Sequence, residues 1–205
     1  MKSVKFCLML ITVLLAAVLT FSCASGGGKT AAPAGPAVPV YSWNFDDPEA
    51  GVAGWDLAPD EFWDFKGTID LARDAVTMGK PMLRVNVDFS KDAGSWWSEP
   101  KLRYDFEEPL DLSNVTRFVF DMYYSPQYMT SGSFKGKMIG FLGTRSVTEA
   151  ELDSIRFLEE VGDYYKATVA FRVRSSRTID SMRLGIVGAV TNYNGPLFLD
   201  NIRWE

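Results

Sequence analysis

Apolar and polar residues alternate with a period of two through most of the chain after residue 80. The longest alternating segments are MLRVNVDF (82–89), RFVFDMYY (117–124), YKATVAFRV (165–173) and MRLGIVGAV (182–190). In each of them, bulky apolar side chains recur at nearly every second position, so an extended segment has one apolar face. This pattern is typical of half-buried antiparallel β-strands.

Shorter alternating segments, separated by Gly, Pro, Asn and Asp, complete the pattern: residues 41–45, 62–71, 101–106, 137–142 and 197–204. Together they make about nine strands joined by turns, which predicts an all-β protein, an antiparallel β-sandwich of the jelly-roll, galactose-binding-like type. No internal repeat is visible.

Residues 146–163 fit two structures. Thr148 and Glu151 have the spacing of a capping box, which would begin a short helix with Ile155 on its buried side. The alternation of Ile155 and Phe157 would equally suit a strand. We predict a short helical stretch here.

The last segment changes parity halfway along. Its bulky residues are Leu197, Leu199, Ile202 and Trp204. All four can face the core only if one extra residue is absorbed between the two pairs, which predicts a β-bulge at Asp200–Asn201. A bulge would release the Asp200 carboxylate from the ladder. The alternative is that Asp200 caps a turn.

The first residues have the features of a secretory signal. Lys2 and Lys5 precede an apolar run that ends at Phe21, and a small residue, Ser22, follows. A short basic region, an apolar core and a small residue before the cut predict a signal peptide over residues 1–22 rather than a membrane span.

The end of this signal resembles the lipobox of bacterial lipoproteins, with Leu19 one position further from Cys23 than the family pattern places it. The resemblance implies that Cys23 is acylated and anchors the protein to a bacterial membrane; the alternative is simple secretion. Residues 23–39 are rich in Ala, Gly and Pro and predict a flexible tether. Residues 40–205 then form one domain, which contains no cysteine and therefore no disulfide.

Charge and composition exclude several functions. The net charge is −5 and Lys and Arg do not cluster, which argues against nucleic acid and favours a neutral ligand. The absence of histidine excludes Ser-His-Asp and Cys-His catalysis and imidazole metal sites.

The motifs NYNGPLFLDNI near the C-terminus, WNFDD at residues 43–47 and GW at 54–55 resemble those of β-sandwich carbohydrate-binding modules. The resemblance covers residues 43–205 and is strongest to family 27, the mannan-binding modules appended to β-mannanases. It implies a structural calcium ion, held by Asp46 or Asp47 together with Asp200, since calcium prefers hard oxygen ligands.

Modules of this kind bind sugars by stacking pyranose rings on exposed aromatic faces. Of the six tryptophans, Trp43 and Trp204 share the parity of apolar neighbours and are predicted to lie in the core. The other four are predicted to contact carbohydrate: Trp55, Trp63, Trp96 and Trp97. Trp55 lies in a Gly- and Pro-bounded loop, and adjacent residues such as Trp96 and Trp97 point to opposite faces of a strand.

We therefore predict a non-catalytic, lipid-anchored protein of the cell envelope that binds a neutral, β-mannan-type polysaccharide or oligosaccharide. A glycosidase is a possible partner of such a protein. The resemblance also implies a third sugar-stacking tryptophan in the second half of the domain, but no tryptophan lies between Trp97 and Trp204. A tyrosine or phenylalanine would have to replace it, or the binding site is shorter. A glycoside hydrolase would need a pair of carboxylates, but none of the candidates stands out: Glu61, Asp64, Asp88, Glu99, Asp105 and Asp121. The main alternative is a structural or adhesive envelope lipoprotein with a protein partner.

Overall fold

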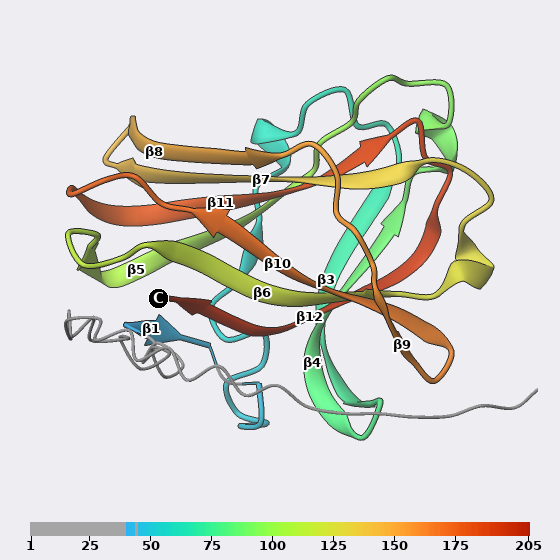
Figure 1. Cartoon of the computed structure of the whole chain (residues 1–205), viewed down its shortest axis with the longest axis horizontal. Coiled ribbons are helices and arrows are strands. Elements are labelled where there is room, and N and C mark those ends of the chain that lie inside the picture. The colour runs from blue at the N-terminus through green and yellow to red at the C-terminus, as the bar shows by residue number, and fades with distance from the viewer. Residues whose placement is uncertain (1–39, 44) are drawn as a thin grey trace, which may run out of the picture. The chain divides into compact units, whose positions relative to one another are not determined.

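The computed structural model describes residues 40–43 and 45–205. The predicted signal, the lipidation residue Cys23 and the tether lie outside these residues. The described part of the chain forms two antiparallel sheets packed face to face (Figure 1). The prediction of an all-β antiparallel sandwich is therefore confirmed. None of the helices formed by the described residues is long and apolar enough to cross a membrane.

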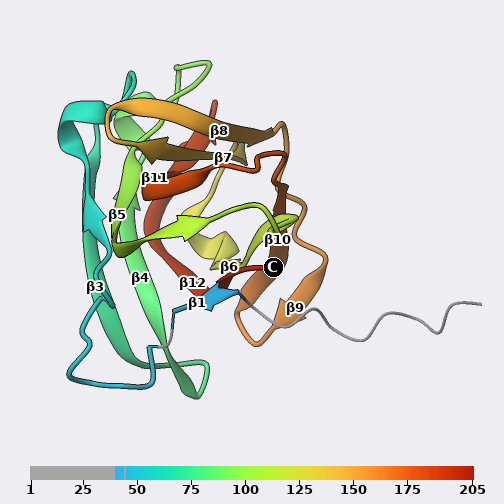
Figure 2. The ribbon, with the colours of Figure 1, turned by 90° about the vertical axis from the view of Figure 1, so that its left-hand side faces the viewer.

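Sheet A has seven strands. In spatial order they are β3 (Thr68–Thr77), β4 (Lys80–Asp88), β12 (Asn194–Trp204), β6 (Arg117–Tyr124), β10 (Tyr164–Arg172) and β9 (Glu159–Val161), with β1 (Tyr41–Ser42) paired to the end of β12. Figure 2 shows β1 beside the C-terminal end of β12, so the first and last strands of the domain meet.

Sheet B has five strands. In spatial order they are β2 (Asp56–Leu57), β5 (Lys101–Asp111), β11 (Thr178–Ala189), β7 (Ser133–Leu142) and β8 (Arg145–Leu152). Short 3₁₀ turns cover Pro59–Glu61, Ser90–Asp92 and Pro126–Tyr128.

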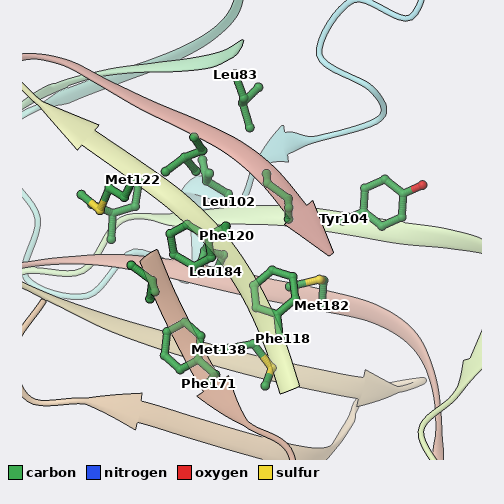
Figure 3. Packing of buried hydrophobic residues seen from close by; sticks show 14 of the residues in the cluster. Leu83, Leu102, Tyr104, Phe118, Phe120, Met122, Met138, Phe171, Met182 and Leu184 are labelled. Carbon is green, nitrogen blue, oxygen red and sulfur yellow. The ribbon is translucent and has the colours of Figure 1, made fainter. Parts of the chain in front are cut away.

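The core lies between the sheets, and the alternating segments supply it. Figure 3 shows members from both sheets, among them Leu83, Phe120 and Met122 of sheet A and Leu102, Met182 and Leu184 of sheet B. Each of these side chains is at most 3% exposed. Full burial of an aliphatic or aromatic side chain contributes about 1.5–3 kcal/mol. The inward rows of apolar residues therefore hold the two sheets together without a disulfide.

The helical prediction for residues 146–163 is wrong, because this stretch begins with strand β8. The methyl group of Thr148 lies over Gly140 of β7, where an added Cβ would come within 2.8 Å of it. Glu149 and Glu151 point to the opposite face and reach Lys137 Nζ at 2.7 and 2.8 Å. The capping-box spacing is instead used for cross-strand pairing, and this pairing outweighs a short local helix.

The bulge predicted in the last strand is confirmed. The register of β12 against β6 shifts between Asp200 and Arg203, and Asn201 has a positive φ of 50°. The four bulky residues on the two sides of the shift, Leu197, Leu199, Ile202 and Trp204, are all 0% exposed. The bulge thus keeps the whole strand facing the core.

The outer faces of the two sheets differ. On sheet A, Met82, Tyr123 and Phe198 form a small buried cluster of their own, with Met78 and Tyr164 packed against it. Residues of the β3–β4 turn and of β10 therefore cover part of this face. The exposed indole of Trp63 instead lies at the outer face of sheet B.

Candidate functional site

Two tryptophans are brought together at the start of β5. The backbone of Trp63 exchanges two hydrogen bonds with that of Glu99 (3.0 and 2.8 Å), which docks the segment before β3 onto the residues that lead into β5. Trp97 lies two residues before Glu99 in the same stretch. The predicted strand over residues 62–71 begins only at Thr68, and an isolated bridge at Trp63 takes the place of its first half.

The two indoles form a corner rather than a flat platform. Their ring centroids are 6.4 Å apart and their planes meet at 87°. Trp63 is 55% exposed and Trp97 is half-buried. A cavity of about 280 Å³ opens between them, lined by Trp63, Trp97, Glu99, Lys101 and Lys137.

A glycine makes room for the floor of this cavity. Gly185 of β11 is the register partner of both Lys101 on β5 and Lys137 on β7. A Cβ at Gly185 would lie 2.8 Å from Glu99 Oε1, so the carboxylate of Glu99 leans into the space that the missing side chain leaves. The floor is therefore a row of Lys101, Gly185 and Lys137, with Glu99 folded against its centre.

Ion pairs and hydrogen bonds hold the polar groups of the floor in place. Lys101 Nζ donates to the carbonyl oxygen of Glu61 (2.5 Å) and lies 3.5 Å from Glu99 Oε1. Burial alone would lower the pKa of Lys137, but its hydrogen bonds to Glu149 and Glu151 raise it above the ordinary value. These cations are thus matched by carboxylates, which suits an uncharged ligand.

The protein also holds the Trp97 ring in place. Trp97 donates from Nε1 to Glu99 Oε2 at 3.4 Å, and Lys135 Nζ lies 5.0 Å from the centroid of the Trp97 ring. A cation at this distance from an indole attracts it by about 0.5–1 kcal/mol at an exposed site. Trp97 is therefore held by contacts that do not involve a ligand.

The family described as "Carbohydrate binding module 27" matches residues 59–204. The chain belongs to this family. The family match confirms the prediction of a non-catalytic carbohydrate-binding module. No curated protein matches the chain.

Solved structures agree with the fold. TmCBM27, a module described for specific mannan recognition, matches with a TM-score of 0.62 and 22% identity over 82% of this chain and 96% of its own. The Caldicellulosiruptor saccharolyticus module CBM27-1, solved with mannohexaose, matches with a TM-score of 0.60 and 18% identity over 80% and 96%. A CBM28 module specific for non-crystalline cellulose matches with a TM-score of 0.56 and 18% identity over 74% and 88%.

The four tryptophans predicted to contact sugar occupy different environments in this carbohydrate-binding module. Trp63 and Trp97 line the cavity, and Trp96 is 79% exposed beside it in sequence but does not line it. Trp43 and Trp204 lie in the core, as predicted.

The prediction of an exposed Trp55 is wrong. Its ring is 2% exposed and packs 5.2 Å from Trp43 and 5.5 Å from Tyr104, measured between centroids. Positive φ angles at Ala53 (52°) and Gly54 (80°) reverse the chain just before it. This reversal turns the indole inward, where the Gly-rich loop alone had suggested an exposed position.

The predicted metal ligands are only partly brought together. Asp46 and Asp200 line a larger cavity of about 660 Å³ beside the bulge of β12, whereas Asp47 does not line it and accepts a hydrogen bond from the N–H of Glu49 (2.8 Å). The ammonium group of Lys80 is in direct contact with the Asp200 carboxylate. Burial alone would lower the pKa of Lys80, but the hydrogen bond and charge of Asp200 raise it above its ordinary value.

Asp121 lines the same cavity and is the register partner of Asp200. Thr168 and Asn201 donate to its two carboxylate oxygens at 2.7 Å each, and Lys166 Nζ lies 3.4 Å away. The two carboxylates are therefore already matched by two ammonium groups. Within the described residues, no group of three or more candidate ligands could hold a metal ion.

Paired in this way, these residues do not offer the roughly six to eight oxygen ligands that a calcium ion takes, so this geometry does not support the predicted calcium site. The Asp200 and Asp121 carboxylates of this larger cavity are already paired with Lys80 and Lys166. The cavity between Trp63 and Trp97 is therefore the better ligand site, although it is smaller.

The polar floor of the site was missed from the sequence. Lys101 and Lys137 were not singled out, and Glu99 was considered only as one of several acids for catalysis. The alternation of Lys101 and Arg103 with buried neighbours places these residues on an outer face. Nothing local indicates that Lys137, far along the chain, lies two strands away from Lys101.

Proposed function

We propose that this module binds a neutral, β-mannan-type glycan at the corner formed by Trp63 and Trp97, with Trp96 as an outer contact. The observation that carries the proposal is the perpendicular pair of indoles over a charge-balanced cavity on sheet B. An indole face matches the apolar face of a pyranose ring in size and carries the complementary quadrupole. The lysine and glutamate side chains of the floor can exchange hydrogen bonds with sugar hydroxyls.

The corner favours a single glycan chain over a crystalline surface. A flat polysaccharide surface needs aromatic rings that lie in one plane, and the two planes here meet at 87°. A single chain can place one sugar on each indole, because successive residues rotate about the glycosidic bonds. The specific mannan recognition described for the similar module TmCBM27 and the mannohexaose complex of the similar module CBM27-1 support mannan as the first ligand to test.

The test is binding of residues 40–205 to mannohexaose by calorimetry, and to mannan, glucomannan, xylan and cellulose by affinity electrophoresis. Replacement of a central tryptophan at an interface costs about 2 kcal/mol or more, so Trp63→Ala is expected to weaken binding at least thirtyfold. Leu158→Ala, at another exposed apolar residue, is the matched control and should bind as wild type. Equal mobility of wild type in all gels would contradict the proposal and favour an envelope protein with a protein partner.

We also propose that the protein is anchored to a bacterial envelope membrane by lipid on Cys23, where it would hold a glycan near a partner glycosidase. The support is the residue pattern before and around Cys23. Mass spectrometry of the protein from its native host, together with membrane fractionation of the Cys23→Ser variant, tests the anchor. Wild-type protein without acyl chains would contradict the lipid anchor and favour simple secretion.

A further inference from the structure

Glu99 combines deep burial with unused hydrogen-bonding capacity. The residue is 5% exposed, and Oε1 accepts no hydrogen bond, although Lys101 Nζ lies 3.5 Å away. Oε2 accepts one long bond, from Trp97 at 3.4 Å. An ionised carboxylate offers about four acceptor positions, and an unsatisfied buried acceptor is costly. The structure thus leaves most of this carboxylate's acceptor capacity without a protein donor.

The position of Glu99 connects this capacity to the ligand site. Another buried carboxylate group of the described residues, that of Asp92, also has an oxygen without a hydrogen bond, whereas Glu205 Oε2 lies 2.6 Å from Arg117 Nη2. Glu99 differs from Asp92 because it lines the cavity between Trp63 and Trp97. Gly185 accommodates its carboxylate there, since any Cβ would come within 2.8 Å of Oε1.

We propose that Glu99 is the residue that recognises sugar hydroxyls and determines which hydroxyl pattern the module selects. A pair of neighbouring hydroxyls on the sugar stacked at the corner donates to the carboxylate, and Lys101, whose Nζ lies 3.5 Å from Oε1, keeps the carboxylate in position. The indoles supply affinity for any pyranose face, whereas the direction of the donated hydrogen bonds separates sugars that differ at one carbon. The inference rests on the proposed function.

Calorimetry with two probes, mannohexaose and cellohexaose, tests it. Glu99→Gln keeps the size of the side chain and removes its charge and half of its acceptor capacity. We expect mannohexaose affinity to fall at least tenfold and the ratio of the two affinities to change. Glu108→Gln is the matched control, because Glu108 is an exposed glutamate farther along β5 that does not line the cavity. This control should bind both probes as wild type.

Gly185→Ala is a second, independent variant. It keeps Glu99 but pushes its carboxylate out of place, and it should weaken mannohexaose binding and shift the ratio in the same direction. Thermal melting of each variant checks the fold. The inference is overturned if both Glu99→Gln and Gly185→Ala keep the wild-type mannohexaose affinity and the wild-type ratio of the mannohexaose and cellohexaose affinities. The proposed function then still stands, provided that Trp63→Ala has lost binding. Retained binding in Trp63→Ala would overturn both.

A cycle with Trp97→Phe separates recognition from positioning of the ring. Phenylalanine has no N–H to donate to Glu99. If Glu99 contacts the sugar, Glu99→Gln weakens binding by the same factor in the wild-type and Trp97→Phe backgrounds. If Glu99 only holds Trp97, Glu99→Gln costs nothing further in the Trp97→Phe background, and direct recognition is refuted.

Discussion

Replacing Lys80 with methionine removes the ammonium group that neutralises Asp200 beside the bulge of β12. The Lys80 side chain is 43% exposed, so solvent screening keeps the direct attraction near that of a surface pair, about 0–1 kcal/mol. Asp200 is only 13% exposed and faces Asp121 across the β12–β6 register, so its unpaired charge adds roughly 1–2 kcal/mol. We expect Lys80→Met to lower the free energy of unfolding by about 1–3 kcal/mol.

Thermal melting with and without a chelator checks this reasoning. A loss of this size corresponds to a fall in Tm of roughly 3–10 °C for a domain of this length. Because Lys80 already supplies the positive charge, chelation should leave the wild-type Tm unchanged. In Lys80→Met, Asp200 has lost that ammonium group, so added calcium is expected to raise the Tm of this variant.

Lys91→Met is the control, because Lys91 is an exposed lysine in the 3₁₀ turn Ser90–Asp92 and is not paired with Asp200; this variant should melt as wild type. A fall in the wild-type Tm of several degrees on chelation would refute the reasoning. It would mean that a metal ion, rather than Lys80, balances Asp200.

Trp55→Ala should lower the free energy of unfolding by about 3–5 kcal/mol in denaturant titrations, because the indole is buried in the core; a loss below about 1 kcal/mol would contradict its burial. Trp96→Ala should weaken mannohexaose binding more than mannotriose binding in calorimetry, because the exposed ring lies outside the cavity; equal losses would argue against an outer contact. Lys137 has a raised pKa in the folded state, so its contribution to stability is present below its ordinary value of 10.5 and is lost as pH rises further. Lys137→Met should therefore lose less stability than wild type above that pH, and parallel stability curves would refute this.

The strands were largely predictable because their signal is local. In a pleated strand, side chains alternate between the two faces, so a buried row such as Leu83, Val85 and Val87 is visible as every second apolar residue. The bulge at Asp200 was predictable for the same reason, since the change of parity between Leu199 and Ile202 had to be absorbed somewhere. Strand β8 was missed because its alternation is weak and its partner, β7, lies outside the segment.

The candidate site was likewise predictable only where its signal is local. Alternation and the tryptophan positions predicted the sandwich fold and placed Trp63 and Trp97 among four candidate sugar contacts, without separating them from Trp55 and Trp96. The corner between these rings and the pairing of Lys80 with Asp200 arise from contacts between residues distant in the chain. Such contacts depend on strand order and register, which many weak interactions set together. A local pattern records which face a residue occupies but not which residue lies beside it.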